Sequence, residues 1–310
     1  MKKIKVLIIS LKNSKRLRYL KSKLDKLKIK FTIINGINGN DYYKKKKLHL
    51  ISNEKKIIRT IGRMMSPPEI GAAASHLKAY KFILKNKIDQ AIIFEDDAIP
   101  SNILNEWINK NYKLKNNEIL SFFAYPSGFL EKEPFKKILN KKIGLHYSKT
   151  HIYSNSCYQI NINTCRKILS ITKGKVIGLP DWPFNINVHK IKLIVTLPFL
   201  TVIDDRGLSS LAASRERIIG EKNILIKKIM PKSLLSIIRI LYYIFYIPFL
   251  SRKYKNLQFY NEHFFSKTVE LLKNYFFKSN LSLYKMSYDT KFYANDLKKD
   301  FKRVLKILLK

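Results

Sequence analysis

The chain has 310 residues, 46% of them hydrophobic, with 18 Tyr and 18 Phe, which argues against a disordered basic protein and for about two folded domains. Its 61 Lys and Arg against 22 Asp and Glu give a net charge of +39, which attracts polyanions: nucleotides, nucleic acid, phosphorylated glycolipids or an anionic membrane face. A composition bias towards lysine would explain the same charge without any partner. Two cysteines exclude a disulfide framework and a CxxC metal knuckle, so a reducing compartment fits.

Residues 3–36 are predicted to form a strand, a helix and a second strand. The segment KIKVLIIS (3–10) is β-branched and apolar, as expected of a buried strand. Its apolar run is short, is interrupted by Lys5 and lacks a small-residue cleavage site, so it is not interpreted as a signal peptide, and a cytoplasmic protein is expected. A helix capped by Asn13 follows to about Lys28, and KFTIING (30–36) forms the next strand. This order favours a parallel sheet flanked by helices.

The segment MSPPEIGAAASHLKAYKFILK (65–85) carries a helix start signal. Ser66 is the expected N-cap, Pro67 the first helical residue, and Glu69, three residues after the serine, completes a capping box. The helix leads into the strand QAIIF (90–94), which ends in three consecutive acids: Glu95, Asp96 and Asp97.

Further strands are expected at 118–125, 156–162 and 191–198, with a short helix opened by Asn163 and a turn or helix start at LPDWPF (179–184). The chain has neither a strict dinucleotide-binding glycine pattern nor a P-loop. A twisted α/β sheet is therefore expected over residues 1–215.

Residues 216–310 differ in character and are predicted to form a helical, basic extension. The run SLLSIIRILYYIFYIPFL (233–250) is apolar, contains Arg239 and Pro248, and has cationic flanks. It is marginal in length for a membrane span, and an arginine at mid-membrane costs about 3 kcal/mol. A helix lying in the membrane interface fits better, while a buried helix or a protein–protein contact stays open as the alternative.

The three acids point to a metal site. Ligands of open α/β sheets bind beyond the carboxyl ends of the strands, and clustered carboxylates repel one another unless a cation lies between them. Alternation along an extended chain places Glu95 and Asp97 on one side, where they would hold Mn²⁺ or Mg²⁺ and a diphosphate, and leaves Asp96 to bond a ribose or a backbone amide. A solvated acidic turn that caps a helix after Pro100 is the alternative.

The segment PPEIGAAASHLKAY, followed about twenty residues later by AIIFEDDAIPS, resembles glycosyltransferase family 25, the lipopolysaccharide-biosynthesis sugar transferases. The segments LIISLKNSKRLRYL, FTIINGING, SNSCYQININTCRKIL, LPDWPF and LPFLTVIDDRGLSS fall in the family's order, so the resemblance covers about residues 4–215. One departure is Ala72, where the family commonly has cysteine after the glycine of its E-I-G segment.

The resemblance implies a GT-A-like nucleotide-binding fold, a nucleotide-sugar donor that is most often UDP-galactose, transfer with inversion, and a divalent ion held by the acid-x-acid pair. It also suggests substrate contacts for Glu69, Ser75, His76 and Arg16. Each has a rival interpretation: the capping box alone explains Glu69, a core position would explain Ser75 and His76, and a solvated helix surface would explain Arg16.

Asp181 is the expected general base, which takes the proton of the acceptor hydroxyl as it attacks the anomeric carbon, and the adjacent Trp182 would stack on a sugar. A helix N-cap is the alternative for Asp181. Ser156 and Cys157 are expected to be small residues beside the sugar. Asp204 and Asp205 fit a plain turn better than a second metal contact, and nothing in the spacing of His189 argues for a ligand.

These observations predict a hexosyltransferase at the inner face of the cytoplasmic membrane. It would transfer galactose from a UDP donor to a lipid-linked saccharide in lipopolysaccharide or lipooligosaccharide biosynthesis. Two alternatives stay open. A metal-dependent nucleic-acid enzyme fits the charge and the acids but lacks aromatic residues interleaved with the lysines, so nucleic acid is not an expected partner. A non-catalytic glycolipid-binding scaffold fits less well, because the acidic, SH and PDW segments are intact.

Overall fold

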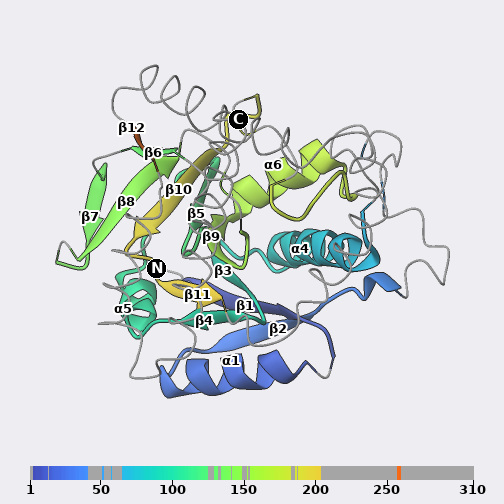
Figure 1. The fold of residues 1–310 in the computed structure, drawn as a ribbon, viewed down its shortest axis with the longest axis horizontal. Coiled ribbons are helices and arrows are strands. Elements are labelled where there is room, and N and C mark those ends of the chain that lie inside the picture. The colour runs from blue at the N-terminus through green and yellow to red at the C-terminus, as the bar shows by residue number, and fades with distance from the viewer. Residues whose placement is uncertain are drawn as a thin grey trace, which may run out of the picture.

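The computed structural model describes residues 3–12, 14–40, 51, 57, 65–124, 129–131, 134–140, 142–148, 152, 154–182, 186, 188–203 and 257–259. These residues form one large mixed sheet with helices on both faces (Figure 1). The α/β class expected from the sequence is confirmed.

The sheet has the strand order β12-β6-β8-β10-β5-β9-β3-β1-β2, with β7 paired to β8. The strands of this sheet are β1 (Lys5–Ser10), β2 (Phe31–Asn35), β3 (Gln90–Glu95), β5 (Glu118–Ser121), β6 (Phe129–Glu131), β7 (Lys136–Ile138), β8 (Ile143–Ser148), β9 (Cys157–Asn161), β10 (Lys192–Leu197) and β12 (Leu257–Phe259).

The expected parallel pairing holds only for part of the sheet. Strand β1 lies parallel between β2 and β3, and β5 is parallel to β10. Strand β9 runs antiparallel to both β3 and β5, and β8 is antiparallel to β10. The expectation of a parallel sheet therefore holds for β2, β1 and β3 and for β5 with β10 but is wrong for β8 and β9, because an apolar run indicates a strand but not its direction.

The helices are α1 (Lys15–Lys26), α4 (Pro67–Lys85), α5 (Ile103–Lys110) and α6 (Ile162–Thr172). The capping box of α4 is confirmed: the Glu69 carboxylate accepts from the Ser66 backbone N–H at 2.9 Å. Two other helix starts shift. Ser14 rather than Asn13 caps α1, and Asn161 rather than Asn163 caps α6, because in each case that side chain accepts from the N–H three residues later.

Two hydrophobic cores cover the two faces of the sheet. Leu7, Ile9 and Ile93 face the core formed with α4 and α6, whereas Ile8 and Phe94 face the core formed with α1 and α5. Figure 1 shows α4 and α6 on one side of β1–β3 and α1 on the other. Because alternate residues of β3 point to opposite faces, Glu95 at its end points towards α4.

A short strand lies between the three acids and the helix that follows Pro100. Residues Ala98–Pro100 form a short strand, β4, that pairs antiparallel with β11 (Thr201–Ile203), and α5 begins only at Ile103. In the C-terminal region, β12 adds an edge strand beside β6. The run 233–250 and the boundary at 215 lie outside the described residues. No helix in the part of the chain that the structure describes is long and apolar enough to cross a membrane.

Candidate active site

A cleft of about 410 Å³ lies at the carboxyl ends of β1, β2 and β3, where ligands of open α/β sheets bind. We call it the acid cleft, because all three consecutive acids line it. Its other lining residues come from the ends of β1 and β2, from α1 and from the first half of α4: Ile9, Ser10, Leu11, Lys12, Ser14, Arg16, Gly36, Ile37, Asn38, Gly39, Asn40, Pro68, Ala72, Ser75 and His76.

The loop after β2 forms one wall of the acid cleft by packing against the start of α4. The Ile37 backbone N–H donates to Ser75 Oγ at 2.8 Å, and Ser75 Oγ donates to the Gly71 carbonyl at 2.6 Å. A Cβ at Gly71 would lie 2.5 Å from the Ile37 carbonyl oxygen, and one at Gly39 would overlap the Pro67 carbonyl. Ser75 therefore contributes to the site by fixing this wall.

Asp96 is held by two partners. Its Oδ1 pairs with Arg16 at 2.9 Å, and its Oδ2 accepts from the Ser10 hydroxyl at 2.7 Å. The side chain is 8% exposed, so its carboxylate is engaged in these contacts. Arg16 thus lies in the acid cleft, as the sequence predicts, but with its guanidinium turned to the acids.

Asp97 is a carboxylate whose ionised form is disfavoured in the acid cleft. Arg16 contacts its Oδ2 at 3.4 Å, while among the described residues the buried Oδ1 has no hydrogen-bond partner. Burial, followed by repulsion from Glu95, raises the pKa of Asp97 from 3.8 to about 7. Asp96 and Asp97 both contact Arg16, and Arg16 and Ser10 occupy the Asp96 carboxylate that was expected to bond a ribose or a backbone amide. Strand β3 ends at Glu95, and the alternation of an extended chain ends with it.

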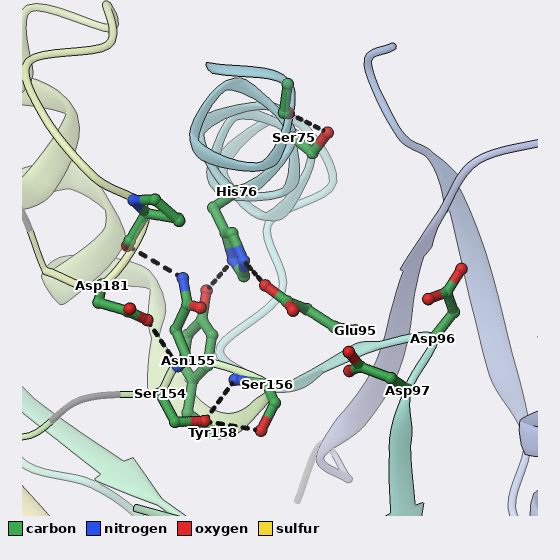
Figure 2. A network of polar contacts seen from close by, with 12 residues as sticks. Ser75, His76, Glu95, Asp96, Asp97, Ser154, Asn155, Ser156, Tyr158 and Asp181 are labelled. Atoms are coloured by element: carbon green, nitrogen blue, oxygen red, sulfur yellow. Dashed lines mark hydrogen bonds and ion pairs between the residues drawn. The ribbon is translucent and has the colours of Figure 1, made fainter. Parts of the chain in front are cut away.

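Glu95 lies on the opposite wall, bound to α4. His76 Nε2 is 2.9 Å from Glu95 Oε1, and His76 Nδ1 is 2.9 Å from the Tyr158 hydroxyl (Figure 2). His76 is buried, whereas the Glu95 side chain is 23% exposed and lines the acid cleft. His76 therefore lies at the wall of the acid cleft, in contact with Glu95.

A turn at residues 154–156 connects Glu95 to Asp181. The Glu95 N–H donates to the Ser156 carbonyl at 2.7 Å, and the Asn155 N–H donates to Asp181 Oδ1 at 3.2 Å. Ser154 has a φ of 96°, a strained conformation for a residue with a side chain. Asp181 is half-buried and does not line the acid cleft, but a single turn separates it from Glu95.

The remaining predicted residues have more local roles. Trp182 is 2% exposed and packs edge-on against Tyr158, with ring centroids 4.8 Å apart, so its ring is not available to stack on a sugar. Glu69 is buried in the capping box, Ser156 Oγ bonds Ser154 Oγ at 2.9 Å, and Cys157 is buried. Asp204 and Asp205 lie outside the described residues.

The acid cleft suits a metal ion only in partnership with a substrate. Within the described ranges, no group of three or more His, Cys, Asp and Glu side chains is placed to hold a metal. Among the residues that the structure describes, however, none donates to the buried Asp97 Oδ1. Burial and then repulsion from Glu95 raise the pKa of Asp97, and a cation would relieve that repulsion. Mg²⁺ is commonly bound by one or two carboxylates plus substrate phosphates. Glu95 and Asp97 fit that arrangement.

Sequence reasoning missed several parts of this site. Lys12 and the loop at 36–40 line the acid cleft, and Ser10 bonds Asp96. Their positions in the sequence could have identified them, because each follows or ends a predicted strand, and ligands of open α/β sheets bind at the carboxyl ends of the strands. Tyr158 and Tyr80, by contrast, resemble ordinary core aromatics in the sequence.

Comparisons with known proteins extend this picture. Residues 3–180 match the family model of glycosyltransferase family 25, described as an LPS biosynthesis protein. Among curated proteins, none matches the chain significantly.

Solved structures give a loose likeness. They include A197 from STIV (12% identity, 67% of this chain and 97% of that chain, TM-score 0.32) and mannose-1-phosphate geranyltransferase from Thermus thermophilus (8%, 63% and 74%, 0.34). A third is the inositol-1-phosphate CTP transferase from T. maritima (11%, 70% and 98%, 0.35). These TM-scores are too low to carry a functional assignment.

Proposed function

The chain belongs to glycosyltransferase family 25, and from this premise we propose that it transfers galactose from UDP-galactose to a saccharide acceptor, with inversion at the anomeric carbon. Family membership makes the chain a glycosyltransferase, so the nuclease and scaffold alternatives are not retained. The donor, the stereochemistry and the acceptor are our proposals.

The acid cleft is the observation that carries the proposal. Three carboxylates face two cations there, Lys12 and Arg16, so a diphosphate would meet net negative charge at pH values where all three acids are ionised. A divalent cation, when bound, supplies the positive charge that neutralises a diphosphate leaving group. Glu95 and Asp97 would hold it.

The chain's own residues orient the donor. The carboxylate of Asp96 holds the Arg16 guanidinium in the acid cleft, where it would contact phosphate oxygens beside Asp97. The loop at 36–40, fixed to α4 through Ser75, bounds the cleft on the side of β2. A nucleoside in the cleft would lie along this loop.

Asp181 is our proposed general base. In a single displacement the acceptor oxygen attacks the anomeric carbon, the bond from that carbon to the diphosphate breaks, and Asp181 accepts the hydroxyl proton. The 154–156 turn supports this role, because it connects Asp181 to Glu95. The Asn155 N–H, 3.2 Å from Asp181 Oδ1, fixes the position of this carboxylate.

We further propose a lipid-linked acceptor at the inner face of the cytoplasmic membrane. The net charge of +39 would attract that anionic surface, and residues 233–250 would lie in its interface. Sedimentation with anionic vesicles tests this location. A chain truncated before Lys227 should sediment less than the full chain, and equal sedimentation would exclude the segment as the anchor.

Calorimetric titration tests the donor site. UDP-galactose, UDP-glucose and UDP are titrated with and without Mn²⁺ into the wild type and Asp97→Ala. Metal-dependent binding that disappears in the variant is expected, with UDP-galactose preferred over UDP-glucose. Absence of binding by the wild type under all conditions would refute the proposed donor.

A further inference from the structure

A buried chain of hydroxyl and imidazole groups lies behind Glu95. His76 and Tyr80 project from the same face of α4, four residues apart, and Tyr158 comes from β9. Distances of 2.9, 2.9 and 2.8 Å join Glu95 Oε1 to His76 Nε2, His76 Nδ1 to the Tyr158 hydroxyl, and that hydroxyl to the Tyr80 hydroxyl. His76, Tyr158 and Tyr80 are 3%, 0% and 4% exposed.

The order of the hydrogens in this chain follows from its ends. A carboxylate only accepts, so His76 Nε2 must carry a hydrogen and donate it to Glu95. In a neutral imidazole Nδ1 then accepts, and Tyr158 donates to it. The Tyr158 oxygen in turn accepts from Tyr80. The reverse order would leave the Tyr80 hydrogen without an acceptor among the residues that the structure describes.

The environment of the two tyrosines keeps them as hydroxyl donors. Burial raises the pKa of both Tyr80 and Tyr158 well above the usual tyrosine value. The Tyr158 ring is held in place by Trp182, which packs edge-on against it at 4.8 Å.

Resting on the proposed function, we infer that Tyr158 and Tyr80 are positioning residues: they fix His76 as the Nε2–H tautomer, and His76 thereby holds the Glu95 carboxylate on the α4 wall of the acid cleft. Alternation along β3 points Glu95 towards α4, and the His76 contact fixes its carboxylate there, while Arg16 pairs with Asp96 and Asp97. The hydrogen-bond chain therefore keeps one carboxylate apart from the Arg16 cluster and presents it to the substrate.

Tyr158→Phe tests the inference, because it removes the hydroxyl and keeps the ring that contacts Trp182. Tyr147→Phe is the matched control: its hydroxyl bonds Glu118 at 3.4 Å, away from the acid cleft. The first readout is the nitrogen NMR spectrum of His76 in the metal-free protein. Wild type and control should show a protonated Nε2 and an unprotonated Nδ1, whereas Tyr158→Phe should show a mixture of tautomers.

Binding and turnover give the second readout. Removing the direct outer-shell partner of a ligating side chain typically costs about 10–100-fold in metal affinity or activity. Tyr158 contacts that partner, His76, rather than Glu95 itself, so Tyr158→Phe should weaken Mn²⁺ binding and lower kcat by up to about 10-fold, the lower end of that range. The KM for UDP-galactose at saturating Mn²⁺ should change less, since Arg16 and Asp97 are untouched. Tyr80→Phe, one hydroxyl further away, should have a smaller effect of the same kind.

A double-mutant comparison separates positioning from packing. Glutamine at position 76 carries an N–H donor for Glu95 that needs no tautomer, so in the His76→Gln background Tyr158→Phe should change Mn²⁺ affinity less than about twofold. An equal loss in both backgrounds would mean that Tyr158 acts by packing and would overturn the inference.

The NMR result stands independently of catalysis. A wild-type His76 with hydrogen on Nδ1, or an unchanged tautomer in Tyr158→Phe, would overturn the inference even if transfer occurs. If the wild type binds neither Mn²⁺ nor UDP-galactose, the proposed function fails, while the tautomers of wild type and variant still judge the hydrogen-bond chain.

Discussion

Replacing Asp97 by asparagine should stabilise the metal-free protein at alkaline pH while abolishing metal-dependent UDP binding. Burial and Glu95 raise the pKa of this carboxyl from 3.8 to about 7. In the unfolded chain the group ionises near 3.8, so between these values the native state binds more protons than the unfolded state. The Asp97 contribution to stability is therefore fully present below about pH 4 and is lost as pH rises through 7.

The magnitude follows from the same shift. At about 1.4 kcal/mol per pKa unit, ionising Asp97 costs the native state up to about 4 kcal/mol at about pH 9. Asparagine resembles the neutral carboxyl and avoids this cost. The gain in unfolding free energy of Asp97→Asn over wild type should be near zero at about pH 4 and rise to about 2–4 kcal/mol at about pH 9.

Urea unfolding at several pH values in EDTA measures this difference. Asp96→Asn is the matched control with the opposite sign, because it removes a carboxylate already satisfied by Arg16 and Ser10 and should destabilise by about 1–3 kcal/mol. The raised pKa of Asp97 would be refuted if Asp97→Asn were no more stable than wild type at about pH 9, or if its gain in unfolding free energy did not vary with pH.

Three further substitutions test other parts of the site. Asp181→Asn keeps an oxygen that accepts from the Asn155 N–H, so it should leave stability and UDP binding unchanged. It should lower kcat by about 10²–10⁴-fold in a transfer assay, because the general base is lost. Unchanged turnover would show that Asp181 only stabilises the 154–156 turn. Gly71→Ala would put a Cβ 2.5 Å from the Ile37 carbonyl oxygen. It should lower the unfolding free energy by about 1–3 kcal/mol, measured with urea, and weaken UDP binding. Wild-type stability and binding would mean that the loop at 36–40 moves away from α4 at little cost. Arg16→Gln removes the cation that contacts Asp96 and Asp97 and should destabilise by about 1–3 kcal/mol at about pH 8. The loss should be smaller at about pH 5, because Asp97, with a pKa raised to about 7, is then largely neutral; a loss equal at both pH values would exclude a charge effect on Asp97.

Much of the fold could be predicted from the sequence, because helix caps and apolar runs are local patterns. The capping box of Ser66 and Glu69 fixes the start of α4, and apolar runs mark β1, β3 and β10. Pairing direction and short edge strands were not legible. Strands β6, β7 and β8 have mixed polar and apolar patterns, and their pairing depends on partners distant in the chain.

The candidate site was predicted in its residues more than in its geometry. The acids, Arg16, Ser75 and His76 do line one cleft. The side from which Asp97 approaches depended on where β3 ends, which periodicity does not define. Trp182 illustrates the opposite error: a tryptophan beside an acid suggested a sugar platform, but burying its large apolar ring against Tyr158 contributes more to packing than exposure would.

The antiparallel pairing of β9 with β3 and β5 has a consequence for how the protein folds while it is being synthesised. The contacts of the site join residues far apart in the chain: Ser10 with Asp96 across 86 positions, Arg16 with Asp97 across 81, and His76 with Tyr158 across 82. Contacts of such high order form late, since loop closure precedes their gain. A nascent chain that has emerged only as far as α5 already carries all three acids, yet His76 has no hydroxyl of Tyr158 behind it. The His76 contact that holds Glu95 therefore gains its Tyr158 partner only when β9 pairs with β3. The active site of the glycosyltransferase is complete only after the centre of its sheet has formed.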